Sequence, residues 1–384
     1  MKPINNICNT LCLSLLLLAS SGCGGSSSSA SQEIVKDTVQ EENEVENKTD
    51  NESETPSVSV KEEPYYKYAW HLEYSAEVEN FGVSKEAHIN VKEAWKTYQG
   101  KGIKIAVIDS RYDVNHEDLK ANIVATFHAN NKDSDVIDIG TEGTHGTTVA
   151  GFIASPLNDK GSVGVAYNAS LILITEEFGD DADTIAAFEY AKAQGAKIIS
   201  NSWGTEHVSE AVAAEIQSLH DAGIVILFAS GNDGKSLDDN GIDDESELTT
   251  VIGIGASDEK NDVAVYSNYG INIDLLAPGG DTDNLGLLGI DDTGTKGSPN
   301  QQALIDNNYA FTNGTSFATP VAAGIVALML EANPNLTPTQ VRQILIDTAD
   351  KIGTGVNYPN NFNEKRAFGK INASRAVELA KTTK

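Results

Sequence analysis

Short apolar segments alternate with helix-patterned segments through the middle of this chain. Residues 102–109 form an apolar run that ends in Asp109, and residues 224–228 form another. Between them, residues 184–193 carry apolar side chains at helical spacing, and residues 197–200 return to a strand pattern. Alternation of strand and helix predicts a parallel sheet that is covered by helices. We therefore expect an α/β fold, a three-layer sandwich with a mainly parallel sheet.

Polar residues follow the carboxyl ends of the predicted strands. Asp109, Ser202 and Asn232 each come at or just after such an end. Ligands of open α/β sheets gather at this edge of the sheet. These three side chains are therefore the first candidates for a functional site.

A serine precedes the longest apolar run of the chain. Residues 313–320 read Asn-Gly-Thr-Ser-Phe-Ala-Thr-Pro, and the apolar run 321–330 follows. This run predicts a buried helix with Ser316 at its N-terminus, where backbone N–H groups lack helical acceptors and the helix dipole is positive. A serine placed there can attack a carbonyl carbon while the amides stabilise the oxyanion, although serine is also an ordinary helix cap.

Serine acyl transfer also needs an imidazole base and a carboxylate that orients the imidazole. His145 opens the small-residue segment 145–151, whose glycines and alanines would let a helix approach the sheet closely. Asp109 would be held rigidly at the end of its buried strand. Asn232 could donate its side-chain amide to the oxyanion, opposite the backbone N–H of Ser316. Each of these residues also has a structural interpretation as a cap, a packed side chain or a turn former.

Three segments of the chain, taken together, resemble the subtilisin-like serine proteases, the subtilases. They are Ala-Val-Ile-Asp-Ser at 106–110, His-Gly-Thr-Thr-Val-Ala-Gly at 145–151 and Gly-Thr-Ser-Phe-Ala-Thr-Pro at 314–320. They occur in the family's order of Asp, His and Ser. The resemblance extends from about residue 65 to the C-terminus, and it implies a subtilisin-like fold and an endopeptidase that works through an acyl-enzyme.

The resemblance assigns four catalytic roles. Asp109 is the orienting acid, His145 the general base, Ser316 the nucleophile and Asn232 the oxyanion donor. Arg111 stands where the family usually has glycine, and its cation could draw Asp109 away from the imidazole. A weakly active or inactive binding protein with a subtilase fold therefore stays open as an alternative.

A substrate cleft is implied by the same resemblance. Ser202, Trp203 and Gly204 match the family's substrate-binding strand, where the substrate backbone pairs as an added β-strand. Ser230 and Gly231 belong to the block that carries the oxyanion asparagine. We expect these residues to line the binding site of a protein or peptide substrate.

Parts of the sequence look closer to the kexin-like branch of the family, which favours basic residues before the cut. Segments 68–72, 89–95 and 202–204 carry this likeness. Asp243, in an acidic loop, is then the candidate partner of a substrate Arg or Lys, although His207 stands where that branch has another acid. A solvated acidic loop is the other interpretation. A dedicated processing protease with basic-residue preference is thus a further alternative.

Two residues match ligand positions of the family's strong calcium site. Asp118 lies nine positions after Asp109, and Asn158 lies in the loop after the predicted His145 helix. Oxygen ligands of this kind suit Ca²⁺. The resemblance implies a structural Ca²⁺ and no cofactor for the chemistry, while the alternative is that Asp118 only caps a turn.

The N-terminal residues predict export. Residues 1–22 have a basic start, an apolar core and a small-residue end, as signal peptides do. Their ending resembles the lipobox of bacterial lipoproteins, which implies that Cys23 is lipidated and that the protein is anchored to a membrane, at the cell surface or in the periplasm. Ser20 stands where that family prefers leucine, so plain secretion is the alternative. Residues 23–64 are serine-rich and acidic and predict a disordered tether, which leaves 65–384 as the peptidase domain.

The acidity of the chain excludes one class of partner. The formal net charge of -29 would repel nucleic acid. No cysteine follows Cys23, so the peptidase domain must be stable without a disulfide. We expect a monomer.

Overall fold

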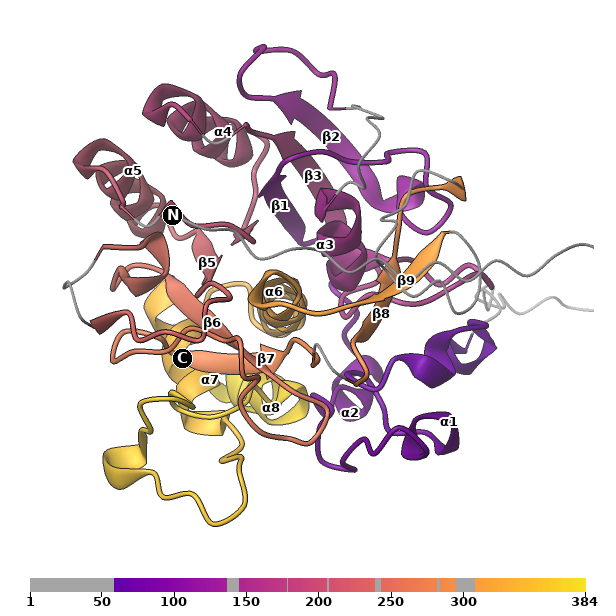
Figure 1. Cartoon of the computed structure of the whole chain (residues 1–384). Coiled ribbons are helices and arrows are strands. Elements are labelled where there is room, and N and C mark those ends of the chain that lie inside the picture. Colours follow the sequence, from indigo (N-terminus) through magenta and orange to yellow (C-terminus); the bar gives the residue numbers. More distant parts are fainter. Residues whose placement is uncertain are drawn as a thin grey trace, which may run out of the picture. The chain divides into compact units, whose positions relative to one another are not determined.

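A parallel sheet of seven strands forms the centre of the computed structural model, with the strand order β2-β3-β1-β4-β5-β6-β7 (Figure 1). The strands are β1 (Lys104–Asp109), β2 (Ile123–His128), β3 (Ser170–Thr175), β4 (Ile198–Asn201), β5 (Val225–Ala229), β6 (Ile252–Ser257) and β7 (Leu275–Pro278). The chain adds β2 and β3 on one side of β1 and the remaining strands on the other side. This reversal places a topological switch point between β1 and β4, where ligands of such sheets bind.

The structure describes residues 59–136, 145–177, 179–205, 207–238, 243–281, 284–294 and 308–384. These residues belong to one unit, Pro56–Lys384. The predicted signal peptide, Cys23 and most of the predicted tether lie outside the described residues. Ser59 to Glu63 fall within the predicted tether, and they begin with a 3-10 turn, η1 (Val60–Glu62).

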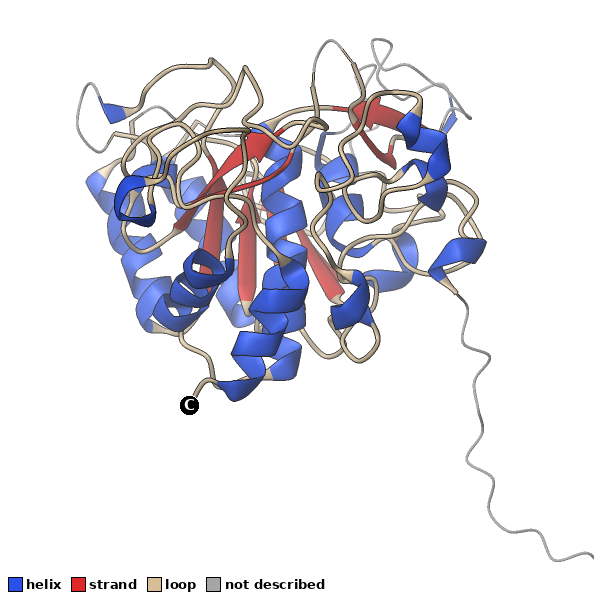
Figure 2. Cartoon of the chain, turned by 90° about the horizontal axis from the view of Figure 1, so that it is seen from below, coloured by secondary structure: helices blue, strands red, loops and turns tan. Residues whose placement is uncertain are grey.

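Helices cover both faces of the sheet (Figure 2). They are α1 (Ala76–Glu79), α2 (Lys92–Trp95), α3 (His145–Ala154), α4 (Asp181–Ala193), α5 (Glu210–Asp221), α6 (Thr315–Ala332), α7 (Pro338–Thr348) and α8 (Ala373–Thr382). A two-stranded antiparallel ribbon, β8 (Leu287–Ile290) and β9 (Tyr309–Thr312), packs against α3.

The residues of β1 alternate between two hydrophobic cores. Ile105 and Val107 belong to the core that includes α3, α6, α7 and α8. Ala106 and Ile108 belong to the core that includes α4 and α5. Both faces of the strand are therefore buried, which explains its continuous apolar sequence. The predicted three-layer α/β sandwich with a mainly parallel sheet is confirmed.

Helix α6 runs through the larger core. Among the helices of the described residues it is the one that is long and apolar enough to cross a membrane, but 83% of this stretch is buried inside the fold. A Cβ atom at Gly324 would lie 2.5 Å from the Val165 Cβ, so the glycine allows a close approach to that chain segment. The helix is thus an internal element of the fold, and it carries Ser316 at its start.

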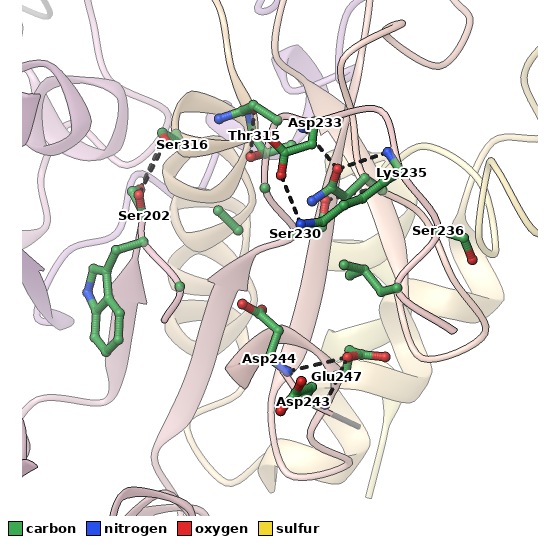
Figure 3. Close-up of a pocket in the computed structure, with 17 residues that line it drawn as sticks. Ser202, Ser230, Asp233, Lys235, Ser236, Asp243, Asp244, Glu247, Thr315 and Ser316 are labelled. Carbon is green, nitrogen blue, oxygen red and sulfur yellow. Dashed lines mark hydrogen bonds and ion pairs between the residues drawn. The ribbon is translucent and has the colours of Figure 1, made fainter. Parts of the chain in front are cut away.

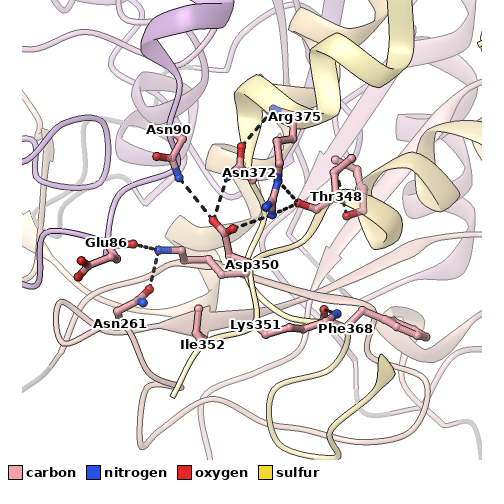
Figure 4. A network of polar contacts seen from close by, with 12 residues as sticks. Glu86, Asn90, Asn261, Thr348, Asp350, Lys351, Ile352, Phe368, Asn372 and Arg375 are labelled. Carbon is pink, nitrogen blue, oxygen red and sulfur yellow. Dashed lines mark hydrogen bonds and ion pairs between the residues drawn. The ribbon is translucent and has the colours of Figure 1, made fainter. Parts of the chain in front are cut away.

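A polar network joins segments near the two ends of the described chain (Figure 4). Lys370 is fully buried, and its Nζ donates to Asn261 Oδ1 at 2.6 Å and to the carbonyl of Glu86. Burial lowers the pKa of Lys370 to about 8. Asp350 accepts from Asn372 Nδ2 at 3.0 Å and from Arg375 Nη2 at 2.6 Å. These bonds hold the segment before α2 against the C-terminal part of the domain.

Candidate active site

The predicted acid and base are in contact at the end of β1. Asp109 is the last residue of the strand and is 3% exposed. His145 is the first residue of α3, and its Nδ1 lies 2.9 Å from each carboxylate oxygen of Asp109. The backbone N–H of Ser110 also donates to Asp109 Oδ1, at 2.7 Å. The carboxylate is therefore held in the position needed to fix the imidazole tautomer.

A glycine explains how α3 comes so close to the end of β1. A Cβ atom at Gly146 would lie 2.5 Å from the carbonyl oxygen of Arg111. Only a residue without a side chain leaves room for this approach. The backbone of Arg111 thus packs on the first turn of α3, and Asp109 keeps its contacts with His145 and Ser110.

The environment of His145 favours the protonated imidazole. Burial disfavours the charged form, but the negative charge of Asp109 and its hydrogen bond outweigh burial and raise the pKa of His145 above the usual value of a histidine. The side chain is still 37% exposed, so the other ring nitrogen remains accessible to a substrate. An imidazole of this kind is suited to accept a proton from a hydroxyl group.

Ser316 lies in the first turn of α6, as the sequence predicts. Gly314 caps the helix with φ 147°, a conformation that glycine adopts readily. The backbone N–H of Ser316 donates no hydrogen bond within the described part of the chain. The ring of the next residue, Phe317, has its centroid 5.3 Å from that of His145, so the imidazole lies beside the serine-bearing turn.

The Ser316 hydroxyl has a partner from the predicted substrate-binding segment. Its Oγ donates to the carbonyl of Ser202 at 3.2 Å. The Ser202 Oγ donates in turn to the carbonyl of Ser316 at 2.7 Å. In the described residues, Ser316 Oγ donates to Ser202 rather than to His145, so proton transfer requires a rotation of the serine side chain.

Asn232 is oriented by the residue before the serine. Its Oδ1 accepts from both the backbone N–H of Thr315, at 2.9 Å, and the Thr315 hydroxyl, at 3.0 Å. This pairing occupies Oδ1, so the Nδ2 amide is the group of this side chain that can donate to a ligand. An amide donor close to the first turn of a helix is the type of group that can stabilise an oxyanion.

A second asparagine, which the sequence does not single out, supports this turn. Asn268 Oδ1 accepts from the backbone N–H groups of Asp233 and Lys235, at 2.9 and 3.1 Å. A Cβ atom at Gly231 would lie 2.5 Å from the Asn268 amide nitrogen, and Gly231 has φ +94°. The glycine and Asn268 therefore fix the loop that presents Asn232.

A cavity of about 490 Å³ opens beside Ser316 (Figure 3). The residues predicted to bind substrate all line it, and they are Ser202, Trp203, Gly204, Ser230, Gly231 and Asp243. Asn232 and Ser316 line it as well. The cavity is large enough for one substrate side chain next to the reacting carbonyl.

Asp243 is engaged with a neighbour at the cavity wall. Its Oδ1 lies 2.6 Å from Nδ1 of His207, and this hydrogen bond and the negative charge raise the pKa of His207. Two further carboxylates, Asp244 and Glu247, line the same cavity. The acidic composition of the loop is the one signal for them in the sequence.

The predicted calcium ligands lie next to each other, because both Asn158 and Glu63 act on the pKa of the Asp118 carboxyl. Asp118 is fully buried, and its Oδ1 has no hydrogen-bond partner among the described residues; the same holds for Asn158 Oδ1. Glu63, which the sequence does not single out, joins them: its Oε1 accepts from Asn158 N at 2.7 Å, and its Oε2 is buried with no partner in the part of the chain that the structure describes. Burial raises the pKa of Asp118 to about 7. Three buried, unpaired oxygens from two carboxylates and an amide suit Ca²⁺.

Comparison with known proteins agrees with this geometry. Residues 100–370 match the Subtilase family, Peptidase_S8. The chain belongs to the subtilase family. Subtilisin DY of Bacillus licheniformis is 32% identical to this subtilase over 266 residues, which are 68% of this chain and 88% of that relative.

Other subtilase relatives are longer than this chain. The calcium-dependent protease of Trichormus variabilis is 33% identical over 347 residues, which cover 81% of this chain and 51% of that protein. A subtilase-type serine protease of Deinococcus radiodurans is 30% identical over 318 residues, with 77% of this chain and 43% of the relative covered. The chain thus spans about half the length of these two relatives.

Solved structures share the fold. A protease from Pseudoalteromonas arctica superposes with a TM-score of 0.70 at 27% identity, and the match covers 84% of this subtilase and all of that chain (100%). The serine protease of Aeromonas sobria has a TM-score of 0.74 at 21% identity, with 88% and 71% of the two chains covered. These neighbours support a subtilisin-like arrangement of sheet and helices.

Proposed function

We propose that this subtilase is a serine endopeptidase in which Ser316 is the nucleophile, His145 the general base, Asp109 the orienting acid and Asn232 the oxyanion donor. The observation that carries the proposal is the contact of His145 Nδ1 with both Asp109 oxygens, 2.9 Å each, beside the helix turn that bears Ser316. A histidine held in this way can accept the serine proton.

The reaction would proceed through an acyl-enzyme. Ser316 Oγ turns from the Ser202 carbonyl to His145, gives up its proton and attacks the substrate carbonyl carbon. The backbone N–H of Ser316 and the Asn232 amide stabilise the oxyanion of the tetrahedral intermediate. His145 then protonates the leaving amine, and water hydrolyses the acyl-enzyme in the reverse sequence of proton transfers.

We further propose that Ca²⁺ binds between Glu63, Asp118 and Asn158. The support is the set of three buried oxygens without partners, together with the name "calcium-dependent protease" of one relative. The ion would offset the cost of burying two carboxylates side by side. It would stabilise the chain around Glu63 and the loop after α3 and take no part in the chemistry.

The N-terminal assignments also remain proposals. A signal peptide over 1–22, lipidation of Cys23 and an acidic tether over 23–64 rest on the sequence pattern, and export agrees with a family that includes the Bacillus subtilisins. The partner would be a protein or peptide substrate, and the enzyme a membrane-anchored monomer.

Replacement of the nucleophile tests the proposed function. Ser316→Ala should abolish hydrolysis of casein and leave the far-ultraviolet circular dichroism spectrum unchanged, because within the described residues the hydroxyl makes one hydrogen bond and no apolar contact is lost. Hydrolysis that persists in the purified variant would exclude Ser316 as the nucleophile. Loss of the folded spectrum would mean that the serine has a structural role.

A further inference from the structure

A buried carboxylate, Glu245, holds the segment that follows β4. We infer that Glu245 is a positioning residue for substrate binding: it fixes Thr205, so that the backbone of Gly204 stays in place to pair with a substrate. Glu245 is not among the described residues that line the cavity beside Ser316, so it would act through Thr205. This inference rests on the proposed endopeptidase function and adds a residue to its substrate-binding site.

Both oxygens of Glu245 are bonded to one residue. The Thr205 hydroxyl donates to Oε1 at 2.6 Å, and the Thr205 backbone N–H donates to Oε2 at 3.0 Å. Glu245 is 1% exposed, whereas Thr205 is exposed at the surface. Hydrogen bonds to an ionised acceptor are stronger than those to a neutral one. Glu245 therefore holds an exposed backbone segment from inside the protein.

The segment beyond the end of β4 is fixed at both of its ends. At the near end, Ser202 exchanges hydrogen bonds with Ser316 (Figure 3). At the far end, Thr205 is held by Glu245. Between them, Gly204 is exposed, and within the described residues neither its N–H nor its carbonyl has a backbone hydrogen-bond partner. These are the groups that an added substrate strand would use.

The turn that carries Glu245 is fixed by contacts of its own. Glu245 opens the 3-10 turn η5 (Glu245–Glu247), which Asp244 caps by accepting from the backbone N–H of Ser246 at 2.9 Å. The turn packs against β5 and β6 of the central sheet. The position of Thr205 is therefore tied to the sheet.

A carboxylate is the side-chain group that can accept both bonds at once. Thr205 offers two donors, and each Glu245 oxygen accepts one of them. A glutamine at this position has one carbonyl oxygen and an NH2 group that only donates, so one of the two bonds would be lost. Burial raises the pKa of Glu245, while the bonds from Thr205 act in the opposite direction and so offset part of the cost of the buried charge.

Two substrates that differ in length test the inference. Succinyl-Ala-Ala-Pro-Phe-p-nitroanilide has a backbone long enough to lie along residues 202–204, whereas succinyl-Phe-p-nitroanilide ends before it reaches Gly204. Glu245→Gln should raise KM for the long substrate about tenfold and leave its kcat within about twofold, because the lost contact serves binding alone. It should leave kcat/KM for the short substrate within about twofold.

Substitutions of Thr205 test the same contact from the exposed side, where the fold is least affected. Thr205→Val removes the hydroxyl and should raise KM for the long substrate about fivefold. Thr205→Ser keeps both donors and should leave this KM within about twofold of the wild-type value. Glu245→Gln should raise KM by a smaller factor in the Thr205→Val background than in the wild type, because the two residues form one contact.

A matched control lies at the other end of α6 from Ser316. Glu331 Oε2 accepts from the backbone N–H groups of Gln99 and Gly100, at 2.7 and 2.6 Å. Glu331→Gln also weakens bonds from a carboxylate to the backbone, so it should lower Tm and leave KM for the long substrate within about twofold. If Glu331→Gln raises this KM as much as Glu245→Gln does, KM reports a general loss of stability and the inference is wrong.

The outcomes separate this inference from the proposed function. An unchanged KM for the long substrate in Glu245→Gln overturns the inference and leaves the endopeptidase standing. A fall in kcat for both substrates at unchanged KM also overturns it, because Glu245 would then act on the catalytic groups. Cleavage of neither substrate by the wild type, under conditions where a control subtilase cleaves both, overturns the proposed function together with the inference.

Discussion

Ser202 and Ser316 exchange hydrogen bonds, each hydroxyl donating to the other residue's carbonyl, at 2.7 and 3.2 Å. A proline explains why the Ser316 carbonyl accepts from the Ser202 hydroxyl. Pro320 lies four residues after Ser316 in α6 and has no N–H, so the Ser316 carbonyl lacks its helical donor. The Ser202 hydroxyl takes the place of that donor. The turn that bears the nucleophile is thus held by the segment that is proposed to bind the substrate.

Removal of the Ser202 hydroxyl should therefore slow the reaction. Ser202→Ala should lower kcat about fivefold and change KM little, since one hydrogen bond of about 1 kcal/mol that positions Ser316 is lost while the backbone of residue 202 remains. Steady-state kinetics on one peptide substrate measure the effect. A rise in KM at unchanged kcat would show instead that the hydroxyl serves substrate binding.

A double-mutant cycle tests the part played by Pro320. Pro320→Ala restores a backbone N–H that can reach the Ser316 carbonyl, so Ser202→Ala should cost less in this background than in the wild type. The comparison of kcat for the four proteins gives the coupling. Additive effects of the two substitutions on kcat would contradict the view that the Ser202 hydroxyl replaces the missing N–H of Pro320.

Removal of calcium should destabilise the domain. The buried carboxylates of Glu63 and Asp118 would then have no cation beside them, and EDTA should lower Tm by about 5 °C or more, consistent with a few kcal/mol of linked binding free energy. Excess Ca²⁺ should restore Tm. Glu63→Gln should reduce this response, and Asp347→Asn, which lies on α7, should keep it. The same Tm with EDTA and with Ca²⁺ would exclude the site.

The acid limb of the pH profile should lie at higher pH than the pKa of an ordinary histidine. Asp109 raises the pKa of His145, and catalysis requires the neutral imidazole, so kcat/KM increases as pH rises through that raised value. Asp109→Asn removes the cause of the increase. It should move the limb to lower pH and also lower kcat, by about 10⁴-fold if the tautomer is no longer fixed. If the acid limb of kcat/KM lies at the same pH in Asp109→Asn as in the wild type, the limb reports the titration of a group other than His145.

Local sequence patterns were sufficient for the framework of the site. The predicted strand is β1, which ends at Asp109 as expected. The predicted helix is α3, which begins at His145 as expected. The helix at Ser316 was predicted for the same reason, since helix starts and strand ends have strong local signals. Parallel strands then bring their carboxyl ends together at one edge of the sheet.

Contacts between distant segments could not be predicted in this way. Glu63 stands in acidic sequence that is typical of a tether, and its burial depends on the backbone of Asn158, far along the chain. Asn268 has no local pattern that ties it to the loop of Asn232. The sequence suggests an acidic pocket wall but does not show that Asp243 contacts His207 or that Glu247 joins the wall, because both depend on how the loop folds.

The reactivity of Ser316 is the most direct test of this account. A fluorophosphonate probe, followed by mass spectrometry of the digested protein, reports whether one serine is activated and which one it is. We predict a single adduct, on the peptide that contains Ser316, which is absent in Ser316→Ala and formed far more slowly in His145→Ala. The absence of an adduct under conditions that label a control subtilase, or an adduct on a different serine, would contradict the account.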